Sequence, residues 1–299
     1  MEGIFGSFGD LVPARPTEHL GNSDLSFGGK LSPPLHIGED GGASGCGGKV
    51  WIAGELLCEY ILEKSENGDG SGLLWQHHRA ATDAHESQKS HVKGKTHVLE
   101  LGSGTGVVGL CVALLAQQHP AEMGDVHVTV TDIGELVPLM QSNIDSNHVS
   151  SVASAESLCW GSALIQEHQH PDVVLAADCV YLEAAFPLLE RTLMDLTDGD
   201  HPPLVLMAYR KRRKADRHFF QRIKHNFDVV EVSDYEHFAE YKKQRTSLFE
   251  LVRREPSAPI QASAKEVVSE DAGIPLLKKQ LPCTPSVSVA TPISIPTVV

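Results

Sequence analysis

The sequence predicts an α/β fold: a doubly wound, mainly parallel seven-stranded sheet whose last pair of strands is antiparallel. Short apolar runs that suit buried strands alternate with segments whose apolar residues recur at spacings of three and four, as on one face of a helix. Strands and helices that alternate along a chain form βαβ units, and such units build a parallel sheet. The last two strands are joined by a stretch without a strong helical stripe, so we expect these two to be antiparallel.

The first predicted helix covers residues 49–63, because Trp51, Leu56 and Tyr60 share one apolar stripe. Further helices are expected at 107–115, 136–146, 182–196 and 216–225. Strands are expected at 97–101, 126–131, 157–160, 173–177, 204–208, 227–232 and 247–252. Most of these strands are short apolar runs, which is typical of the buried strands of a parallel sheet.

A single folded domain is predicted for residues 31–254. Residues 1–30 are rich in Gly, Pro and Ser, and residues 255–299 are rich in Pro and Ser, so both are expected to be disordered tails. Residues 64–96 are polar and crowded with Gly, Ser and His, so we expect a surface insertion there. The histidines of this insertion fit no metal-ligand spacing, and no metal site is predicted.

The chain carries a formal net charge of −14. Proteins that grip the phosphates of nucleic acid are usually basic, so direct nucleic-acid binding is not expected, and an acidic surface suits a basic protein partner instead. The N-terminal residues lack the basic and apolar regions of a signal peptide. No run reaches the roughly 18 apolar residues of a membrane span. We therefore expect a cytoplasmic protein that makes no membrane contact.

The strongest functional signal is residues 100–106, Glu-Leu-Gly-Ser-Gly-Thr-Gly, which follow a predicted strand and precede a helix. In this position Gly102 permits a tight turn, Gly104 permits close approach of a ligand to the backbone, and Gly106 permits close packing of the helix start. A dinucleotide-binding fingerprint would require another glycine where the sequence has Val107. The alternative is an ordinary glycine-rich turn between a strand and a helix.

Two acidic residues end predicted strands of the same sheet. Asp132 closes the second strand, where a carboxylate can accept hydrogen bonds from both hydroxyls of a ribose. Asp178 follows the strand that ends at Ala177, and Tyr181 comes three residues later. Ligands of doubly wound sheets bind beyond the carboxyl ends of the strands, so these side chains are candidate site residues. The alternative for each is a solvated strand-end acid beside a packing tyrosine.

These motifs resemble those of the class I, seven-β-strand (non-SET) protein-lysine methyltransferases. Residues 100–106 resemble the first motif of that family, and Asp178-Cys179-Val180-Tyr181 matches its DxxY motif. Three further segments also resemble the family, in the same order: Gly47 to Trp51, Leu158-Cys159-Trp160-Gly161, and Ala208 to Arg212. The resemblance covers roughly residues 35–254 and is strongest to the fungal members that act on translation elongation factor 1-alpha.

The resemblance implies a Rossmann-like class I methyltransferase fold and a site for S-adenosyl-L-methionine. It implies catalytic roles for Asp178 and Tyr181. The cofactor-binding residues that it implies are Trp51, Glu100, Gly102, Ser103, Gly104, Gly106, Asp132, Trp160 and Ala177. It further implies a protein substrate, elongation factor 1-alpha, methylated by a monomeric enzyme. Two alternatives stay open: a class I methyltransferase of a small molecule or nucleic acid, and a catalytically silent binding module.

A lysine nucleophile sets a chemical requirement on the site. Its ordinary pKa of about 10.4 means that neutralising the amine at pH 7 costs roughly 4–5 kcal/mol. A bare carboxylate beside the lysine would stabilise the charged form, so Asp178 cannot act simply as the base. We therefore expect Asp178 to capture and orient the amine, and Tyr181 to shape the lysine channel.

Overall fold

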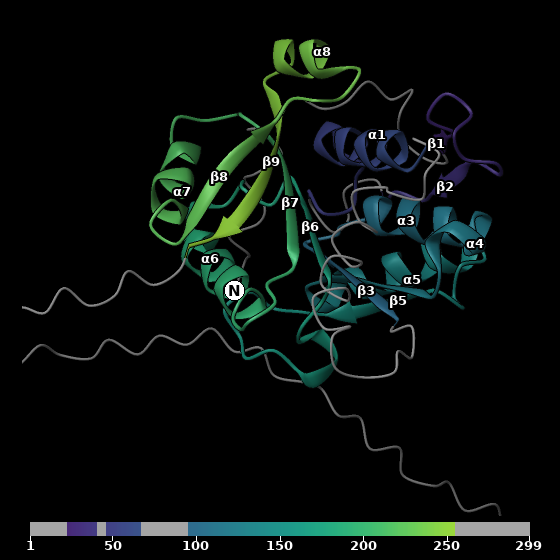
Figure 1. The fold of residues 1–299 in the computed structure, drawn as a ribbon, viewed down its shortest axis with the longest axis horizontal. Helices are drawn as coiled ribbons and strands as arrows, with labels where there is room; N and C mark the ends of the chain where they lie inside the picture. The colour runs from purple at the N-terminus through teal and green to yellow at the C-terminus, as the bar shows by residue number, and fades with distance from the viewer. Residues whose placement is uncertain (1–22, 41–45, 67–94, 255–299) are drawn as a thin grey trace, which may run out of the picture. The chain divides into compact units, whose positions relative to one another are not determined.

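The computed structural model describes residues 23–40, 46–66 and 95–254 (Figure 1). The predicted tail from residue 255 onward and most of the predicted insertion at 64–96 lie outside the described residues, so these two assignments stay predictions. No helix in the described part of the chain is long and apolar enough to cross a membrane.

The centre of the fold is a seven-stranded sheet in the order β5-β4-β3-β6-β7-β9-β8. Its strands are β3 (Thr96–Leu101), β4 (Val126–Asp132), β5 (Ala153–Ser157), β6 (Val173–Ala177), β7 (Leu204–Arg210), β8 (Phe227–Val232) and β9 (Thr246–Arg253). The five strands from β3 to β7 are parallel, whereas β9 runs antiparallel to both β7 and β8. The predicted mainly parallel sheet with an antiparallel last pair is therefore confirmed.

Helices cover both faces of this sheet (Figure 1). The main helices are α1 (Ile52–Glu66), α3 (Val107–Gln118), α5 (Val137–Ser146), α6 (Phe186–Leu196) and α7 (Asp216–Ile223). One apolar cluster joins α1, α3 and α5 to residues such as Val98 and Leu175. A second cluster joins α6 and α7 to Leu99 and Val174, the neighbours of those residues on the same strands. This alternation is what a strand buried on both faces requires, because successive side chains point to opposite faces.

Helix α3 follows the glycine-rich segment and packs unusually close to the sheet. All its residues from Val107 to Ala116 are buried. A Cβ atom on Gly109 would lie 2.4 Å from a methyl group of Val130 on β4, so glycine sets the distance between this helix and the strand. The beginning of α3, and with it the preceding loop, is fixed against the sheet.

Two expectations about the elements were wrong. The third strand covers Ala153–Ser157 instead of 157–160, since it is an edge strand of small residues in which only Ala153 is buried. Helix α8 (Phe238–Lys243) lies between the last two strands, where no helix was expected. With six residues, it is too short to show a helical period.

The N-terminal part of the described chain is also folded. Strand β1 (Ser23–Leu25) pairs with β2 (Leu35–Ile37), so part of the segment predicted to be a disordered tail belongs to the fold. Both strands have three residues, which is too few for an alternating pattern to stand out. The fully buried Leu35 and Ile37 attach this hairpin to the apolar cluster that contains α1.

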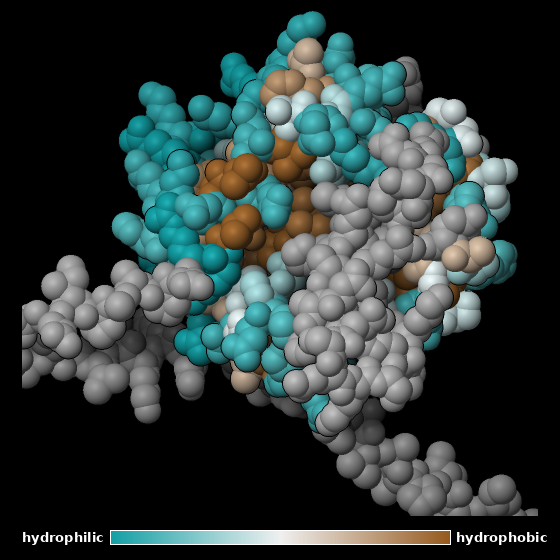
Figure 2. All heavy atoms as spheres, viewed as in Figure 1, coloured by the Kyte–Doolittle hydropathy of each residue, from teal (hydrophilic) through white to brown (hydrophobic). Residues whose placement is uncertain are grey.

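The end of the sheet that carries β8 and β9 has less apolar cover than its centre. In Figure 2, apolar side chains are visible on this part of the molecule. Val230 of β8 and Val252 of β9 are 48% and 44% exposed.

The remaining elements are short: helix α4 (Pro120–Met123) and the 3-10 turns η4 (Gly134–Leu136), η5 (Gln166–His168) and η6 (Glu183–Ala185).

Candidate active site

The order of the strands determines where a ligand can bind. From β3 the chain winds outward through β4 to β5, then returns to β6 on the other side of β3 and continues to β7. The winding direction therefore reverses between β3 and β6, and in such sheets the crevice for a ligand lies beyond the carboxyl ends of these strands. The segments that follow β3, β4 and β6 begin with Gly102, Ile133 and Asp178.

The glycine-rich loop after β3 has a backbone that only glycine adopts easily. Gly102, Gly104 and Gly106 have φ angles of 58°, 58° and 80°, all in the left-handed region. A Cβ atom on Gly102 would lie 2.8 Å from the ring of Trp160, which packs against this turn. The loop therefore depends on glycine for both its conformation and its contacts.

The segment before α1 lies against this loop. A Cβ atom on Gly104 would lie 2.5 Å from the carbonyl oxygen of Gly47. The sequence predicts that Gly104 leaves room for a ligand; what the structure shows beside it is the protein's own backbone at Gly47. The motif that contains Trp51 and the glycine-rich loop, about 50 residues apart in the sequence, are thus parts of one structure.

Asp132 fixes the backbone of the glycine-rich loop. Its Oδ2 atom accepts a hydrogen bond from the Gly104 amide at 2.8 Å, and its Oδ1 atom accepts one from the Ile133 amide at 2.7 Å. Burial raises the pKa of Asp132, which is only partly exposed. Each carboxylate oxygen can accept a second hydrogen bond, so the chemistry of this side chain fits the two hydroxyls of a ribose.

Glu100 and Ser103 lie beneath the loop and stabilise it. Glu100 is 1% exposed, and its Oε2 atom accepts a hydrogen bond from the Gly109 amide in the first turn of α3 at 2.8 Å. Burial raises the pKa of Glu100 to about 8. The Ser103 hydroxyl accepts a hydrogen bond from the Thr131 amide at 2.9 Å, which ties the loop to β4. The hydrogen bonds that the structure shows for the Glu100 and Ser103 side chains are all to other groups of the protein, so both side chains support the loop.

The two tryptophans implied by the resemblance contact different parts of the site. Trp160, in the loop after β5, is half-buried beside Gly102. Trp51 immediately precedes α1 instead of lying within it, and its Nε1 atom donates a hydrogen bond to the carbonyl of Cys46 at 2.8 Å. Aromatic faces at such positions suit an adenine ring or a sulfonium cation.

Asp178 occupies a constrained position at the end of β6. Its φ angle is 60°, a left-handed conformation that aspartate tolerates better than most residues. It is 8% exposed, and its amide donates to the carbonyl of Ala208 on β7 at 2.9 Å. Ala177, the last residue of β6, is partly buried and lies opposite Ala208 in the parallel ladder. The strand ladder thus fixes the backbone at the base of the Asp178 side chain.

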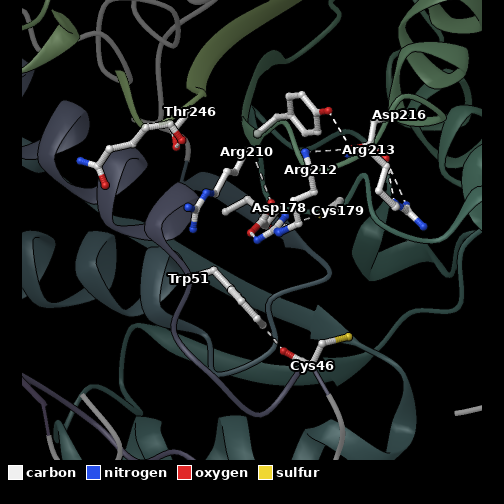
Figure 3. Close-up of polar contacts among 12 residues, drawn as sticks. Cys46, Trp51, Asp178, Cys179, Arg210, Arg212, Arg213, Asp216 and Thr246 are labelled. Atoms are coloured by element: carbon white, nitrogen blue, oxygen red, sulfur yellow. Dashed lines mark hydrogen bonds and ion pairs between the residues drawn. The ribbon is translucent and has the colours of Figure 1, made fainter. Parts of the chain in front are cut away.

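The partner of Asp178 is Arg212, which the sequence analysis did not assign to the site. The guanidinium binds the carboxylate through two parallel hydrogen bonds, from Nη1 to Oδ1 at 2.5 Å and from Nη2 to Oδ2 (Figure 3). Its carbon atom also lies 5.0 Å from the centre of the Trp51 ring. Burial alone would lower the pKa of Arg212, but the hydrogen bonds to Asp178 and the charge of that carboxylate together raise it above its ordinary value.

The loop that carries Arg212 is held by a buried carboxylate. Asp216, which is 1% exposed, accepts hydrogen bonds from the amides of Arg212 and Arg213 at 3.2 and 2.9 Å. The hydroxyl of Tyr209 donates to the same carboxylate at 2.9 Å. The basic run of residues 210–214 is visible in the sequence, but its spacing does not show that Arg212 is the residue that pairs with Asp178.

Tyr181 lies closer to the solvent than Asp178. It is 41% exposed, its carbonyl accepts a hydrogen bond from Nη2 of Arg213, and its hydroxyl interacts with the thiol of Cys46. Burial raises the pKa of the Cys46 thiol. The thiol also interacts electrostatically with Arg212, Asp132 and Asp178. Cys46 and Tyr181 therefore mark the solvent side of the site.

In the part of the chain that the structure describes, no cluster of histidine, cysteine and acidic residues could hold a metal ion.

Comparison with known proteins agrees with this geometry. Residues 30–226 match a family described as lysine methyltransferase. Protein-lysine N-methyltransferase EFM6 of Saccharomyces cerevisiae is 54% identical over 263 residues, covering 85% of this chain and 100% of that protein. EEF1A lysine methyltransferase 3 of Xenopus tropicalis is 34% identical over 63% of this chain and 70% of its own length. Protein N-lysine methyltransferase METTL21A of Danio rerio is 28% identical over 75% of this chain and 86% of its own length.

The match to the family and the similarity to EFM6 each extend over most of the chain and include the glycine-rich loop, Asp132 and Asp178. The fold is the doubly wound sheet that such an enzyme needs, with the candidate residues at the point where its winding reverses. The chain belongs to the lysine methyltransferase family and is a protein-lysine N-methyltransferase that depends on S-adenosylmethionine.

Proposed function

We propose that this enzyme methylates a lysine of translation elongation factor 1-alpha. Two relatives that are 34% and 35% identical to this chain, from Xenopus tropicalis and Mus musculus, are named EEF1A lysine methyltransferase 3. The acidic net charge of −14 supports the same substrate, because it attracts a basic, RNA-associated factor. We further propose that the enzyme acts as a monomer in the cytoplasm, where translation elongation takes place.

The cofactor site that we propose consists of the glycine-rich loop, Asp132, Ala177 and the two tryptophans. The positive φ angles of its glycines let the loop turn tightly beside Asp132, and the Asp132 carboxylate has acceptor capacity for ribose hydroxyls. Trp160 beside Gly102 supplies one aromatic face, and Trp51, whose ring Arg212 covers on one face, supplies another. Glu100 and Ser103 contribute by holding the loop in place. The bound cofactor supplies the electrophilic methyl group.

The observation that carries the proposal is the buried carboxylate of Asp178 at the end of β6, next to the glycine-rich loop. A carboxylate there can accept a hydrogen bond from a substrate amine and hold its lone pair in line with the methyl group. Tyr181, which is exposed on the solvent side, forms part of the channel through which the lysine enters. The work of the protein is therefore mainly the positioning of the nucleophile.

The test is mass spectrometry of elongation factor 1-alpha from cells with and without this gene. We expect one lysine to lose its methylation in the deletion strain, purified enzyme to restore it, and the Asp178→Asn variant to fail to do so. Unchanged methylation at every lysine of that factor would refute this substrate. Transfer of a labelled methyl group to a deletion-strain extract would then reveal the acceptor, because protease removes label from protein and nuclease removes it from nucleic acid.

A further inference from the structure

Arg212 and Asp178 form a largely buried ion pair at the edge of the sheet where the candidate site lies. The two side chains are 18% and 6% exposed, and the carboxylate is engaged on both oxygens by one guanidinium. The same guanidinium lies over the face of Trp51. Arg212 comes from the loop between β7 and α7 and reaches back to the end of β6, 34 residues earlier in the chain.

A carboxylate without a partner would work against methyl transfer to lysine. Only the neutral amine has the lone pair that attacks the methyl group, and a negative charge within about 4–6 Å favours the charged ammonium form. An arginine next to the carboxylate removes this conflict, because the guanidinium stays protonated at any pH at which the protein is folded. The paired carboxylate oxygens keep lone pairs that can accept a hydrogen bond from an amine.

We propose that Arg212 is a positioning residue that balances the charge of Asp178, so that the carboxylate can orient a substrate amine in its neutral, nucleophilic form. The inference rests on the proposed orienting function of Asp178. Arg212 itself transfers no proton and acts through Asp178. Its stacking on Trp51 links the position of this ion pair to the segment that precedes α1.

The other charged groups around the pair do not provide a substitute for Arg212. Lys211 and Arg213 flank Arg212 in sequence; Lys211 is exposed, and the side chain of Arg213 pairs with Asp216 at 3.1 Å. Tyr209 donates its hydroxyl to the same Asp216 carboxylate. Arg210 is exposed, and the bond that it makes to Asp178 comes from its backbone amide, 3.5 Å from Oδ1. The remaining titratable groups that face the site are Tyr181, Cys46, Cys179 and Asp132, of which none carries a positive charge. Among the described residues, removal of Arg212 would therefore leave the Asp178 carboxylate without an ion-pair partner.

The decisive experiment compares pH–rate profiles of the wild-type enzyme and variants at position 212. In Arg212→Gln and Arg212→Met, the rising limb of the pH–rate profile should shift to higher pH by about one pH unit. The reason is that the unpaired Asp178 carboxylate raises the pKa of the substrate amine. At pH 7 this lowers kcat, while the KM for the protein substrate falls or is unchanged. Arg212→Lys keeps a cation, so its limb should stay within a few tenths of a pH unit of the wild type, with a lower kcat since an ammonium cannot form two parallel bonds.

The matched control is Lys214→Gln, which removes a cation from the same loop at an exposed position. Its limb should coincide with that of the wild-type enzyme. A limb that is unmoved in both neutral variants at position 212 would overturn the proposal. A rise in kcat/KM with an unmoved limb would do so too, since it would identify Arg212 as an obstacle to the substrate.

A binding measurement decides the same question without methyl transfer. The probe is n-butylammonium, the charged form of a lysine side-chain analogue. The wild-type enzyme, in which the ion pair is neutral overall, should bind it weakly. Arg212→Gln should bind it roughly tenfold more tightly, because a shift of one pKa unit corresponds to a tenfold change in affinity. Adding Asp178→Asn to that variant should abolish the gain, and equal affinity in wild type and Arg212→Gln would overturn the inference. If the wild-type enzyme transfers no methyl group to elongation factor 1-alpha, only the proposed substrate is refuted. The role of Arg212 is still tested, because the n-butylammonium measurement does not need that substrate.

Discussion

Asp132 and Asp178 end parallel strands on opposite sides of β3, yet they are held in different ways. The carboxylate of Asp132 is bound by backbone amides, one of them from Gly104 in the loop that it faces. The carboxylate of Asp178 is bound mainly by a side chain, the guanidinium of Arg212, while the Arg210 amide is a more distant donor at 3.5 Å. We infer that the cofactor side of the site is built from backbone geometry, and the substrate side from a charge pair.

Among the variants that distinguish the cofactor side of the site from the substrate side, Gly104→Val is expected to have the largest effect. The substitution places a branched side chain against the Gly47 carbonyl and in a left-handed conformation that costs roughly 1–2 kcal/mol. We expect binding of S-adenosylmethionine to be lost in calorimetry and the melting temperature to fall. Gly28→Val is the matched control, because Gly28 has a φ of 73° and no atom within 4 Å of a Cβ. Loss of binding in that control as well would assign the effect to strain alone.

Next in size is Asp178→Asn, which should lower kcat by about a hundredfold through loss of nucleophile positioning. The asparagine oxygen still accepts one hydrogen bond from Arg212, so we expect the affinity for S-adenosylmethionine to change less than about threefold. Steady-state rates and calorimetry on the same preparation give both values. Turnover at the wild-type level would show that Asp178 does not orient the amine.

Asp132→Asn should give the opposite pattern. The loss of a charged acceptor for ribose hydroxyls and for the Gly104 amide should weaken S-adenosylmethionine binding by roughly tenfold or more. At saturating cofactor, kcat should stay within about threefold of the wild type, since the substrate side is intact. Should both variants change kcat and affinity in the same proportion, the division into two sides would be wrong.

A smaller effect, on stability, is expected from Glu100. Its pKa of about 8 in the folded protein lies above the ordinary glutamate value of 4.5, so the folded state keeps a proton that the unfolded state releases. Stability from this group is therefore complete below about pH 4.5 and is lost as the pH rises toward 8. Urea unfolding at several pH values should show this decline, and Glu100→Gln should reduce it. A steeper decline in the variant would contradict the buried, protonated state.

The smallest effects are expected from trimming. A protein of residues 23–254 should keep its turnover within about twofold, because the removed segments are predicted to bury little apolar surface. A protein of residues 31–254 lacks β1, so its melting temperature should be lower by a few degrees. Thermal unfolding of the two proteins measures this difference. Failure of the longer protein to fold would place an essential element outside residues 23–254.

The sequence was most informative where short-range patterns determine the structure. The limits of β6 match the predicted strand because it is a compact run of apolar residues between two aspartates. The limits of β8 match because its β-branched and aromatic residues lie between the polar Asn226 and Ser233. Strand β5 was displaced by four residues in the prediction, because the apolar Leu158 and Trp160 lie in the loop after it. An edge strand with few buried side chains carries little of the signal on which such predictions depend.

The same distinction applies to the candidate site. Asp132 and Asp178 could be predicted to share one edge, because the carboxyl ends of parallel strands meet there. Arg212 could not, because residues 210–214 are all basic and the choice of the one that turns inward depends on the loop that Asp216 holds. A contact between side chains 34 residues apart leaves no periodic trace in the sequence.

The left-handed backbone at Asp178 also bears on how this activity could be lost in evolution. Aspartate and asparagine are the non-glycine residues that adopt this conformation most readily. Most other substitutions there add backbone strain to the loss of the charge. Asparagine keeps the turn and one acceptor for Arg212 and removes only the charge, and a single nucleotide change converts an aspartate codon to an asparagine codon. A copy of this gene released from selection therefore has a short route to a folded protein that still binds the cofactor and its partner but no longer methylates it.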